Sequence, residues 1–198
     1  VMRGINGTIM AYGQTGSGKT FSLLNPGGAE PETAGLLPRL VATLFVRTMV
    51  DASNVYTVEA AASQVYNEQV DDLCHPDYKN GGGHNLSVAT GGSVPGLTWT
   101  RCMAADELLA LFQNARRTLV YAETRMNKAS SRSHAVFQIR VTKRPRASAA
   151  QRGQTVRATV GQLSVVDLAG SERVKRSGVV GQQLKEAVTT LPSARSEP

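Results

Sequence analysis

The 198-residue sequence is poor in the features that stabilise secreted or membrane-spanning chains. Cysteine occurs only at Cys74 and Cys102, with no C-x-x-C pair and no Cys/His cluster at zinc-ligand spacing. Neither a disulfide framework nor a structural metal is therefore indicated. No apolar run approaches the roughly 20 residues of a membrane span, and the start VMRGINGTIMAYG lacks signal-peptide architecture. These absences favour a cytosolic protein with reduced thiols.

Aromatic residues make up only 5%, and the 15 acidic residues are outnumbered by 22 Lys and Arg. The formal net charge of +7 favours an anionic partner, such as nucleic acid, a membrane surface or an acidic protein. Nucleic acid is disfavoured, because the basic residues are not interleaved with aromatic side chains, and Trp99 is interpreted as a core residue. With 41% hydrophobic residues, the chain is sufficient for one folded domain.

Apolar periodicity predicts strands and helices in alternation. Residues 7–12, GTIMAY, indicate a short buried strand, and residues 36–50 have the apolar spacing of a helix. Residues 54–73 are predicted as a long strand that runs into a turn, and two short strands are expected within 85–102. A helix is predicted from Ala104 to about residue 121, with acids early and arginines late, as the helix dipole favours.

Two more strands are predicted in the last third of the chain. Residues 135–143 and 158–168 are apolar, flank a basic linker, and are able to pair as neighbours. Residues 188–198 lose periodicity and contain two prolines, so we expect a disordered end there. The first strand, loop and helix together with the later strands favour an α/β fold.

The segment GQTGSGKT satisfies the G-x-x-x-x-G-K-[ST] pattern of a phosphate-binding loop and lies between a predicted strand and a predicted helix. Its glycines let backbone N–H groups converge on phosphate oxygens, and the helix N-terminus adds a favourable dipole. Lys19 would neutralise phosphate charge, and the Thr20 hydroxyl would coordinate Mg²⁺. The residues expected to bind the phosphates are Gly13, Gln14, Thr15, Gly16, Ser17, Gly18, Lys19 and Thr20.

The segment LSVVDLAGSE, residues 163–172, contains an apolar strand that ends in Asp167. The carboxylate would lie at the C-terminal edge of this strand, where it can orient magnesium-bound water. Gly170 offers an unhindered backbone N–H to the γ-phosphate. An apolar strand followed by Asp is also a common structural pattern, but its occurrence with the glycine-rich loop favours the second half of one site.

The segment NKASSRSH, residues 127–134, places three serines, an Asn, an Arg and a His within eight residues. Ser130 and Ser131 could donate to γ-phosphate oxygens or join the Mg²⁺ shell, and Arg132 could pair with a carboxylate when the loop closes. A solvated serine-rich turn is the alternative that the composition leaves open.

Three blocks, NGTIMAYGQTGSGKTF, TRMNKASSRSH and VVDLAGSERVKRSG, resemble the nucleotide loop, first switch and second switch of the kinesin motor domain. The segments QVYNEQVDDL and LSVATGGSVPGLT are similar to that family's central strand and hairpin region. The resemblance covers residues 3 to about 187, and three blocks in order are far more specific than the loop alone. It implies a P-loop NTPase fold, with a central, mostly β-sheet layer flanked by helices.

The resemblance also implies roles for residues around the nucleotide. Residues 13–20 would bind the phosphates of ATP, and the ring of Phe21 would pack near the adenine. Thr20 and Ser131 would ligate Mg²⁺ directly, with Asp167 behind a metal-bound water. These roles agree with a reaction in which positioning and charge stabilisation do most of the catalysis.

The two switch segments would respond to the γ-phosphate. By the resemblance, Ser130 and Gly170 would contact the γ-phosphate or the attacking water, and Asn127 would help to sense the nucleotide. Arg132 and Glu172 would form a latch that closes around ATP and opens after hydrolysis.

The sequence departs from the family at both ends. The family's first strand precedes any residue present here, and the similarity ends after Ala187. We therefore expect residues 1–187 to be a partial motor domain, truncated at both ends, and residues 188–198 to be a divergent tail. Each large apolar side chain left uncovered would lose about 1.5–3 kcal/mol of burial, against a total stability of about 5–15 kcal/mol. We expect the activity to belong to the parent motor and to be impaired in this fragment.

The function that the resemblance implies is that of an ATP-dependent microtubule motor of the cytoplasm and cytoskeleton, with ATP and Mg²⁺ as cofactors. Tubulin's acidic surface would suit the +7 charge; no nucleic-acid partner and no membrane insertion are expected, and dimerisation would use absent segments. Two alternatives stay open. One is another P-loop ATPase or GTPase, although the guanine-reading N-K-x-D pattern is lacking. The other is a degenerate motor that binds nucleotide or microtubules without turnover.

Overall fold

The computed structural model describes residues 1–27, 31–80, 82–125, 133–146 and 157–172. In chain order its elements are β1 (Gly7–Ala11), α1 (Lys19–Leu24), α2 (Leu36–Val50), β2 (Asn54–Tyr66), β3 (Gln69–Asp72), β4 (Thr100–Cys102), α3 (Ala105–Arg125), β5 (His134–Pro145) and β6 (Thr159–Asp167). Single-turn 3₁₀ helices lie at Pro31–Thr33 and Tyr78–Asn80.

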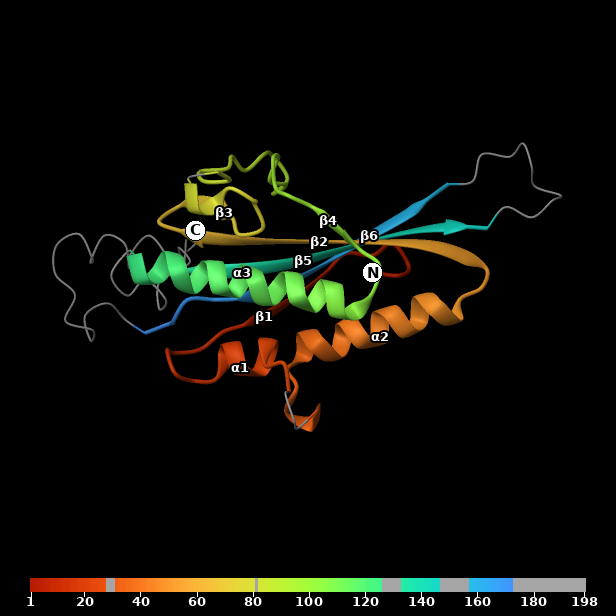
Figure 1. Ribbon diagram of the computed structural model, residues 1–198, viewed down its shortest axis with the longest axis horizontal. Helices are drawn as coiled ribbons and strands as arrows, with labels where there is room; N and C mark the ends of the chain where they lie inside the picture. Colours follow the sequence, from red (N-terminus) through yellow and green to blue (C-terminus); the bar gives the residue numbers. More distant parts are fainter. Residues whose placement is uncertain (28–30, 81, 126–132, 147–156, 173–198) are drawn as a thin grey trace, which may run out of the picture.

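The strands of the described part form one mixed sheet in the order β1-β6-β5-β2-β3, with β4 also paired to β2. β1 and β6 are parallel, with Ala11 opposite Asp167, whereas the other pairs are antiparallel. Because β1 and β6 run in the same direction, both end at the same edge of the sheet. The loop after β1 therefore lies beside the residues that follow β6 (Figure 1).

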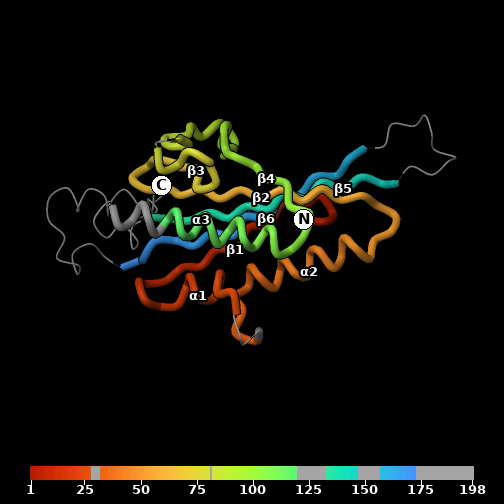
Figure 2. The backbone as a smooth tube through the Cα atoms, in the orientation of Figure 1, coloured from red at the N-terminus to blue at the C-terminus, as the bar shows by residue number. Residues whose placement is uncertain are grey.

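One face of the sheet and helices α1–α3 enclose the hydrophobic core. In β5 the buried residues Ala135, Phe137, Ile139 and Val141 alternate with more exposed ones, as the two-residue period of a strand requires. The Phe137 ring meets Phe112 of α3 edge to face, with ring centroids 5.2 Å apart. Figure 2 traces α3 across the middle strands and α2 along the lower side of the sheet.

The start of α3 is fixed by its own sequence. The Met103 backbone N–H, just before the helix, donates a 2.7 Å hydrogen bond to Glu107 Oε2, which ties the entering chain to the first turn. Asp106 and Glu107 also place negative charge in the first turn, where the helix dipole favours it. The helix begins at Ala105, one residue after the predicted Ala104.

Most of the predicted elements are confirmed. The helix over 36–50 matches α2, and the strands over 135–143 and 158–168 correspond to β5 and β6, which pair antiparallel over nine residue pairs. The segment 54–73 is instead two strands, because Asn67 and Glu68 adopt positive φ angles of 49° and 63° and reverse the chain.

Two predictions within the sheet region are wrong. The segment 85–102 forms one strand, β4, and contributes an isolated bridge at Leu86, because the Ala89–Ser93 stretch closes a local turn instead of pairing along its length. The second wrong prediction is that the strand over 7–12 is buried. β1 is an edge strand among the described residues and is only partly buried, with Met10 61% exposed.

Trp99 is likewise not a core residue. It is half-buried, and the Arg140 guanidinium lies over its ring at 3.7 Å from the centroid. A cation of this kind is attracted to the face of the ring.

Candidate nucleotide-binding site

The glycine-rich loop turns sharply between β1 and α1. Gly16 and Gly18 adopt left-handed φ angles of 80° and 89°, which side chains other than glycine rarely tolerate. A Cβ atom at either position would meet no heavy atom within 4 Å, so these two glycines face open space rather than packed protein. The loop thus presents bare backbone to a cavity, as a phosphate cradle requires.

Lys19, the first residue of α1, folds back over the loop. Its Nζ donates hydrogen bonds of 2.8 Å to the Gly13 carbonyl and 2.9 Å to the Gln14 carbonyl. The ammonium group is therefore held against the loop, where a phosphate that entered the cavity would meet its positive charge.

Thr20 and Asp167 link α1 to the end of β6. The Thr20 hydroxyl donates a 2.5 Å hydrogen bond to Asp167 Oδ2, across 147 residues of sequence. The other carboxylate oxygen, Oδ1, is buried and has no hydrogen-bond partner among the described residues. Since a buried carboxylate oxygen needs a donor or a cation, the pair of Thr20 and Asp167 fits the donor set of a hydrated Mg²⁺ ion.

Glu172 reaches the glycine-rich loop from beyond β6. Its Oε2 accepts a 3.0 Å hydrogen bond from the Thr15 backbone N–H, and its Oε1 accepts a hydrogen bond from the Thr15 hydroxyl. The side-chain bond from Thr15 is the main cause that holds the pKa of Glu172 below its ordinary value, whereas desolvation acts in the opposite direction. A Cβ at Gly170 would meet both of these side chains, so the close contact between Glu172 and Thr15 depends on glycine at this position.

Backbone contacts also hold the segment after β6 against the loop. The Ser171 N–H donates 3.0 Å to the Gly13 carbonyl, and the Leu168 N–H donates 3.4 Å to the Ala11 carbonyl. On the other side, the Ala169 N–H donates 3.0 Å to His134 Nδ1. These bonds fix where Asp167 and Gly170 lie relative to the phosphate loop.

A cavity of about 430 Å³ opens between these elements. It is lined by the loop and α1, by the starts of β5 and the segment after β6, and by α3. Phe21 lines it and is 62% exposed, so its ring is available to stack on a planar group. Ser133 also lines it, and its buried Oγ has no partner among the described residues.

The cavity brings together half of the predicted site residues, and Gly13, Gln14, Ser17 and Glu172 are not part of its lining. The structure places Thr15, Gly16, Gly18, Lys19, Thr20, Phe21, Asp167 and Gly170 around it. Asn127, Ser130, Ser131 and Arg132 lie outside the described residues, so the predicted latch between Arg132 and Glu172 stays a prediction. The sequence did not predict the contact of Glu172 with Thr15. It also did not predict a role for Ser133, although this residue belongs to the serine-rich segment 127–134, which was the available signal.

A strand, a glycine-rich loop and a helix beside a second strand that ends in Asp define the P-loop NTPase fold. Within this class the chain belongs to the kinesin motor domain family, whose sequence profile matches residues 1–193. The kinesin heavy chain of Neurospora crassa is 35% identical over 188 residues, which are 94% of this chain and 19% of that protein. The kinesin-like protein KLP1 of Chlamydomonas reinhardtii is 39% identical over 191 residues, 94% of this chain and 24% of that protein.

Solved structures agree with the sequence comparisons. A fast kinesin, described with its ATPase mechanism and its interactions with microtubules, superimposes with a TM-score of 0.81 at 34% identity. The superposition covers 96% of this chain and 51% of that one. The chain thus spans about half of a solved motor structure and about a fifth of the kinesin heavy chain from Neurospora. Within the described ranges, no helix is both long and apolar enough to cross a membrane.

Proposed function

We propose that this chain carries the ATP-binding half of a microtubule motor and that the site between β1, α1 and β6 binds Mg²⁺ and ATP. The observation that carries the proposal is the Thr20–Asp167 hydrogen bond with its buried, unpartnered Asp167 Oδ1. In this site Thr20 would ligate Mg²⁺ and Asp167 would accept from a water on the ion. When bound, the ion would neutralise charge on the phosphates.

The glycine-rich loop would hold the phosphates through its backbone N–H groups and Lys19. Lys19 is preorganised for this role, because two carbonyl oxygens of the loop already orient its ammonium group. Such preorganised charge costs no reorganisation when the reaction occurs. Phe21, exposed at the edge of the cavity, would stack on the adenine.

The contacts of the segment after β6 would change with the presence or absence of the γ-phosphate. Glu172 accepts two hydrogen bonds from Thr15, so it engages the phosphate loop directly. Movement of Glu172 from Thr15 to Arg132 would couple the loop to the first switch, with Gly170 and Ser130 toward the γ-phosphate. Ser131 would complete the Mg²⁺ shell, and Asn127 would sense the nucleotide.

The whole protein would convert ATP hydrolysis into movement on microtubules in the cytoplasm. Membership in the kinesin family and the +7 charge support binding to an acidic polymer such as the microtubule. We also propose that residues 1–187 belong to the motor domain and that 188–198 form a tail outside it. Dimerisation would depend on other parts of the protein.

The experiment that tests the proposal is Lys19→Ala in the full-length protein. We expect the variant to lose Mg·ATP binding in calorimetry and microtubule-stimulated ATP turnover together, whereas exposed Lys79→Ala, outside the site, retains both. Nucleotide affinity equal to that of the wild type in the Lys19 variant would contradict the proposal. Binding of Mg·ATP by the wild type without turnover on microtubules would instead identify the degenerate motor.

A further inference from the structure

An apolar groove lies at the end of the molecule opposite the phosphate loop. It has a volume of about 390 Å³ and is bounded by the C-terminal half of α2, the start of β2, β4 and the start of α3. Two methionines at its rim are far more exposed than apolar side chains usually are, Met49 at 82% and Met103 at 69%. Flexible, exposed methionines beside an apolar groove are typical of surfaces that bind other polypeptides.

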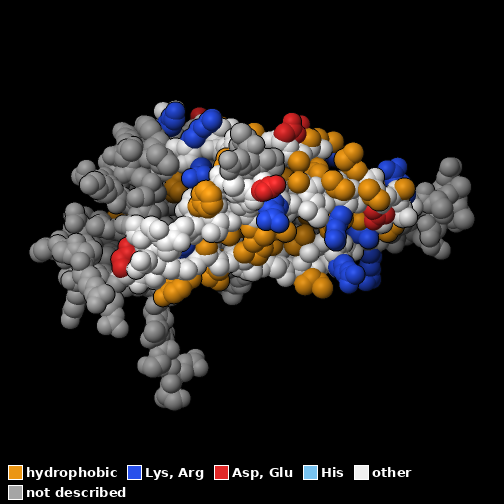
Figure 3. All heavy atoms as spheres, turned by 90° about the horizontal axis from the view of Figure 1, so that it is seen from below, with side chains coloured by type: hydrophobic (Ala, Val, Ile, Leu, Met, Phe, Trp, Pro, Cys, Tyr) orange, Lys and Arg blue, Asp and Glu red, His pale blue; other side chains and the backbone are white. Residues whose placement is uncertain are grey.

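The hairpin formed by β5 and β6 has a basic end that adjoins this groove. Residues 135–166 contain six Lys and Arg and no Asp or Glu. Of these, Arg144, Arg146 and Arg157 are exposed and form no ion pair within the part of the chain that the structure describes. Arg47 of α2 and Arg101 of β4 are also exposed, and Arg101 lines the groove. Figure 3 shows Lys and Arg side chains next to hydrophobic ones at the end where this hairpin projects.

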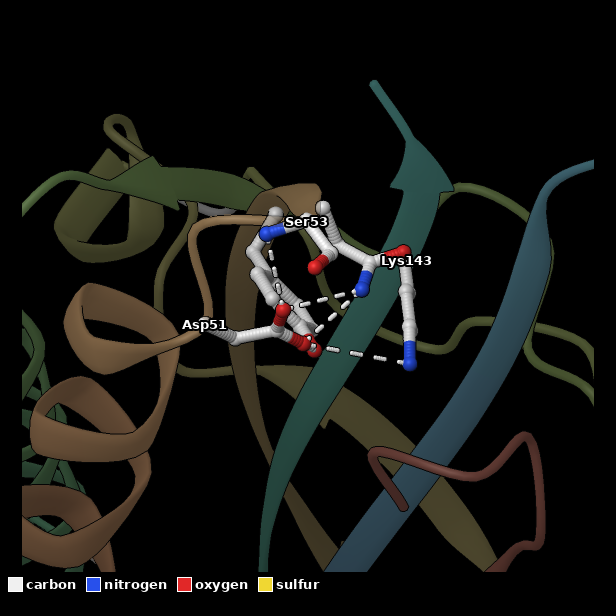
Figure 4. Close-up of polar contacts among 5 residues, drawn as sticks. Asp51, Ser53 and Lys143 are labelled. Atoms are coloured by element: carbon white, nitrogen blue, oxygen red, sulfur yellow. Dashed lines mark hydrogen bonds and ion pairs between the residues drawn. The ribbon is translucent and has the colours of Figure 1, made fainter. Parts of the chain in front are cut away.

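Tyr56 connects the groove to the hairpin. Its ring lines the groove, and its hydroxyl donates a 2.5 Å hydrogen bond to Asp51 Oδ2 in the turn after α2. Lys143 of β5 lies with Nζ 3.9 Å from the same oxygen and 6.0 Å from the centre of the Tyr56 ring. Figure 4 shows Asp51 at the end of α2 with Lys143 reaching it from β5. The groove and the basic end of the hairpin therefore form one fixed surface, here called the hairpin-side surface.

The charge of the hairpin-side surface is positive once its own acids are counted. Asp51 accepts hydrogen bonds from Ser53, Asn54 and Tyr56 and forms an ion pair with Lys143. Glu107 accepts from the Met103 backbone, and Asp106 lies beside it in the first turn of α3. Glu59, opposite Arg101 in the β2–β4 pairing, is a fourth acid and lies 3.9 Å from Arg140. Against these four acids stand seven basic residues, Arg47, Arg101, Arg140, Lys143, Arg144, Arg146 and Arg157.

We propose that the hairpin-side surface docks a protein segment that carries apolar side chains next to acidic ones. The groove would take the apolar side chains and exclude water from them, while the basic rim would select against cationic segments and speed association. A nucleic acid is disfavoured, because bases need exposed aromatic rings to stack on, and Tyr56 is held half-buried by its bond to Asp51. The surface is separate from the nucleotide site and does not depend on the function proposed above.

The probe is a fluorescein-labelled synthetic peptide with Leu at helical spacing and Glu at the intervening positions, titrated with the full chain and followed by anisotropy. We expect binding about tenfold tighter than that of two control peptides, one with Lys for Glu and one with Ser for Leu. Added salt should weaken the binding, because rim charges contribute to it. Equal binding of the Lys peptide, or tighter binding of a single-stranded oligonucleotide, would overturn the proposal.

Matched variants locate the binding on the surface. Met103→Glu, in the groove, and Arg144→Glu, on the rim, should each weaken peptide binding about tenfold. Val88→Glu, which is also exposed on a loop elsewhere, and Arg39→Glu, at the other end of α2, should change it less than about twofold. Melting curves of all four variants exclude unfolding as the cause. Equal losses in the controls, or no loss in Met103→Glu and Arg144→Glu, would assign the peptide to another site.

Discussion

Two aspartates at opposite ends of the sheet have opposite surroundings. Asp51, in the turn after α2, accepts hydrogen bonds from the Ser53 backbone, the Asn54 amide and the Tyr56 hydroxyl, and Lys143 lies 3.9 Å from it. Asp167, at the end of β6, accepts from the Thr20 hydroxyl through one oxygen and leaves the other, buried, without a partner among the described residues. Every hydrogen-bonding need of the Asp51 carboxylate is met nearby, whereas Asp167 Oδ1 still lacks a donor or cation within the described part of the chain.

The difference separates structural from functional carboxylates. A satisfied carboxylate stabilises the fold around it, because each donor offsets the loss of water. A buried oxygen without a donor costs free energy and is retained where a ligand repays that cost, which is the usual pattern at functional sites. The two ends therefore predict opposite outcomes when either carboxylate is changed.

The largest expected effect is that of Asp167→Asn on turnover. The amide keeps the size of the side chain but loses the charge that would orient the metal-bound water, so ATP turnover in the full-length protein should fall roughly 100-fold or more. The melting temperature should change by less than about 2 °C, because the lost charge was poorly compensated. Steady-state kinetics and melting curves on the same samples check both parts. A large loss of stability with normal turnover would make Asp167 a structural residue like Asp51.

An effect of intermediate size is expected for Tyr56→Phe. The change removes one donor to Asp51 and should lower stability by about 1 kcal/mol, which corresponds to about 2–4 °C in the melting temperature. Nucleotide affinity should not change, because Tyr56 lies at the other end of the sheet. Tyr12→Phe is the matched control, since Tyr12 is 74% exposed and its hydroxyl is not part of the Asp51 cluster. Equal destabilisation by the two changes would remove the special role of the Asp51 cluster.

The smallest effect concerns pH. Hydrogen bonds, that from Tyr56 first, hold the pKa of Asp51 below its ordinary value of 3.8. A carboxyl whose pKa is lower in the folded state adds stability that is present above its unfolded pKa and is lost as pH falls through its folded pKa. The wild type should therefore lose stability below about pH 4 more steeply than Asp51→Asn does. Melting temperatures of both proteins from pH 6 to pH 2.5 test this, and parallel curves would refute it.

Much of the nucleotide end could be predicted from the sequence, because each part is encoded locally. Gly16, Gly18 and Lys19 belong to a contiguous pattern whose geometry follows from glycine conformation and helix start. Asp167 could be predicted because an apolar strand ends there, and the parallel pairing of this strand with β1 places Asp167 beside the loop. Family resemblance added Glu172, although not its contact with Thr15, which depends on how the segment after β6 folds back.

The opposite end could not be predicted in the same way. The Asp51 cluster joins α2, β2 and β5, and no local pattern shows that Lys143 lies opposite Tyr56 in the sheet. The reversal at Asn67 and Glu68 was missed because it lacks the glycine that usually marks such turns. Within 85–102, only Thr100–Cys102 pairs with a neighbouring strand and Leu86 forms a single bridge, since pairing depends on neighbours more than on composition.

The most direct test of the difference between the two ends is hydrogen–deuterium exchange of the full chain with and without Mg²⁺ and a non-hydrolysable ATP analogue. If Asp167 belongs to the nucleotide site, backbone amides of residues 13–21 and 163–172 should gain protection, whereas residues 51–57 and 141–146 should exchange at unchanged rates. Protection confined to the Asp51 end, or no change at the loop at saturating analogue, would contradict the assignment.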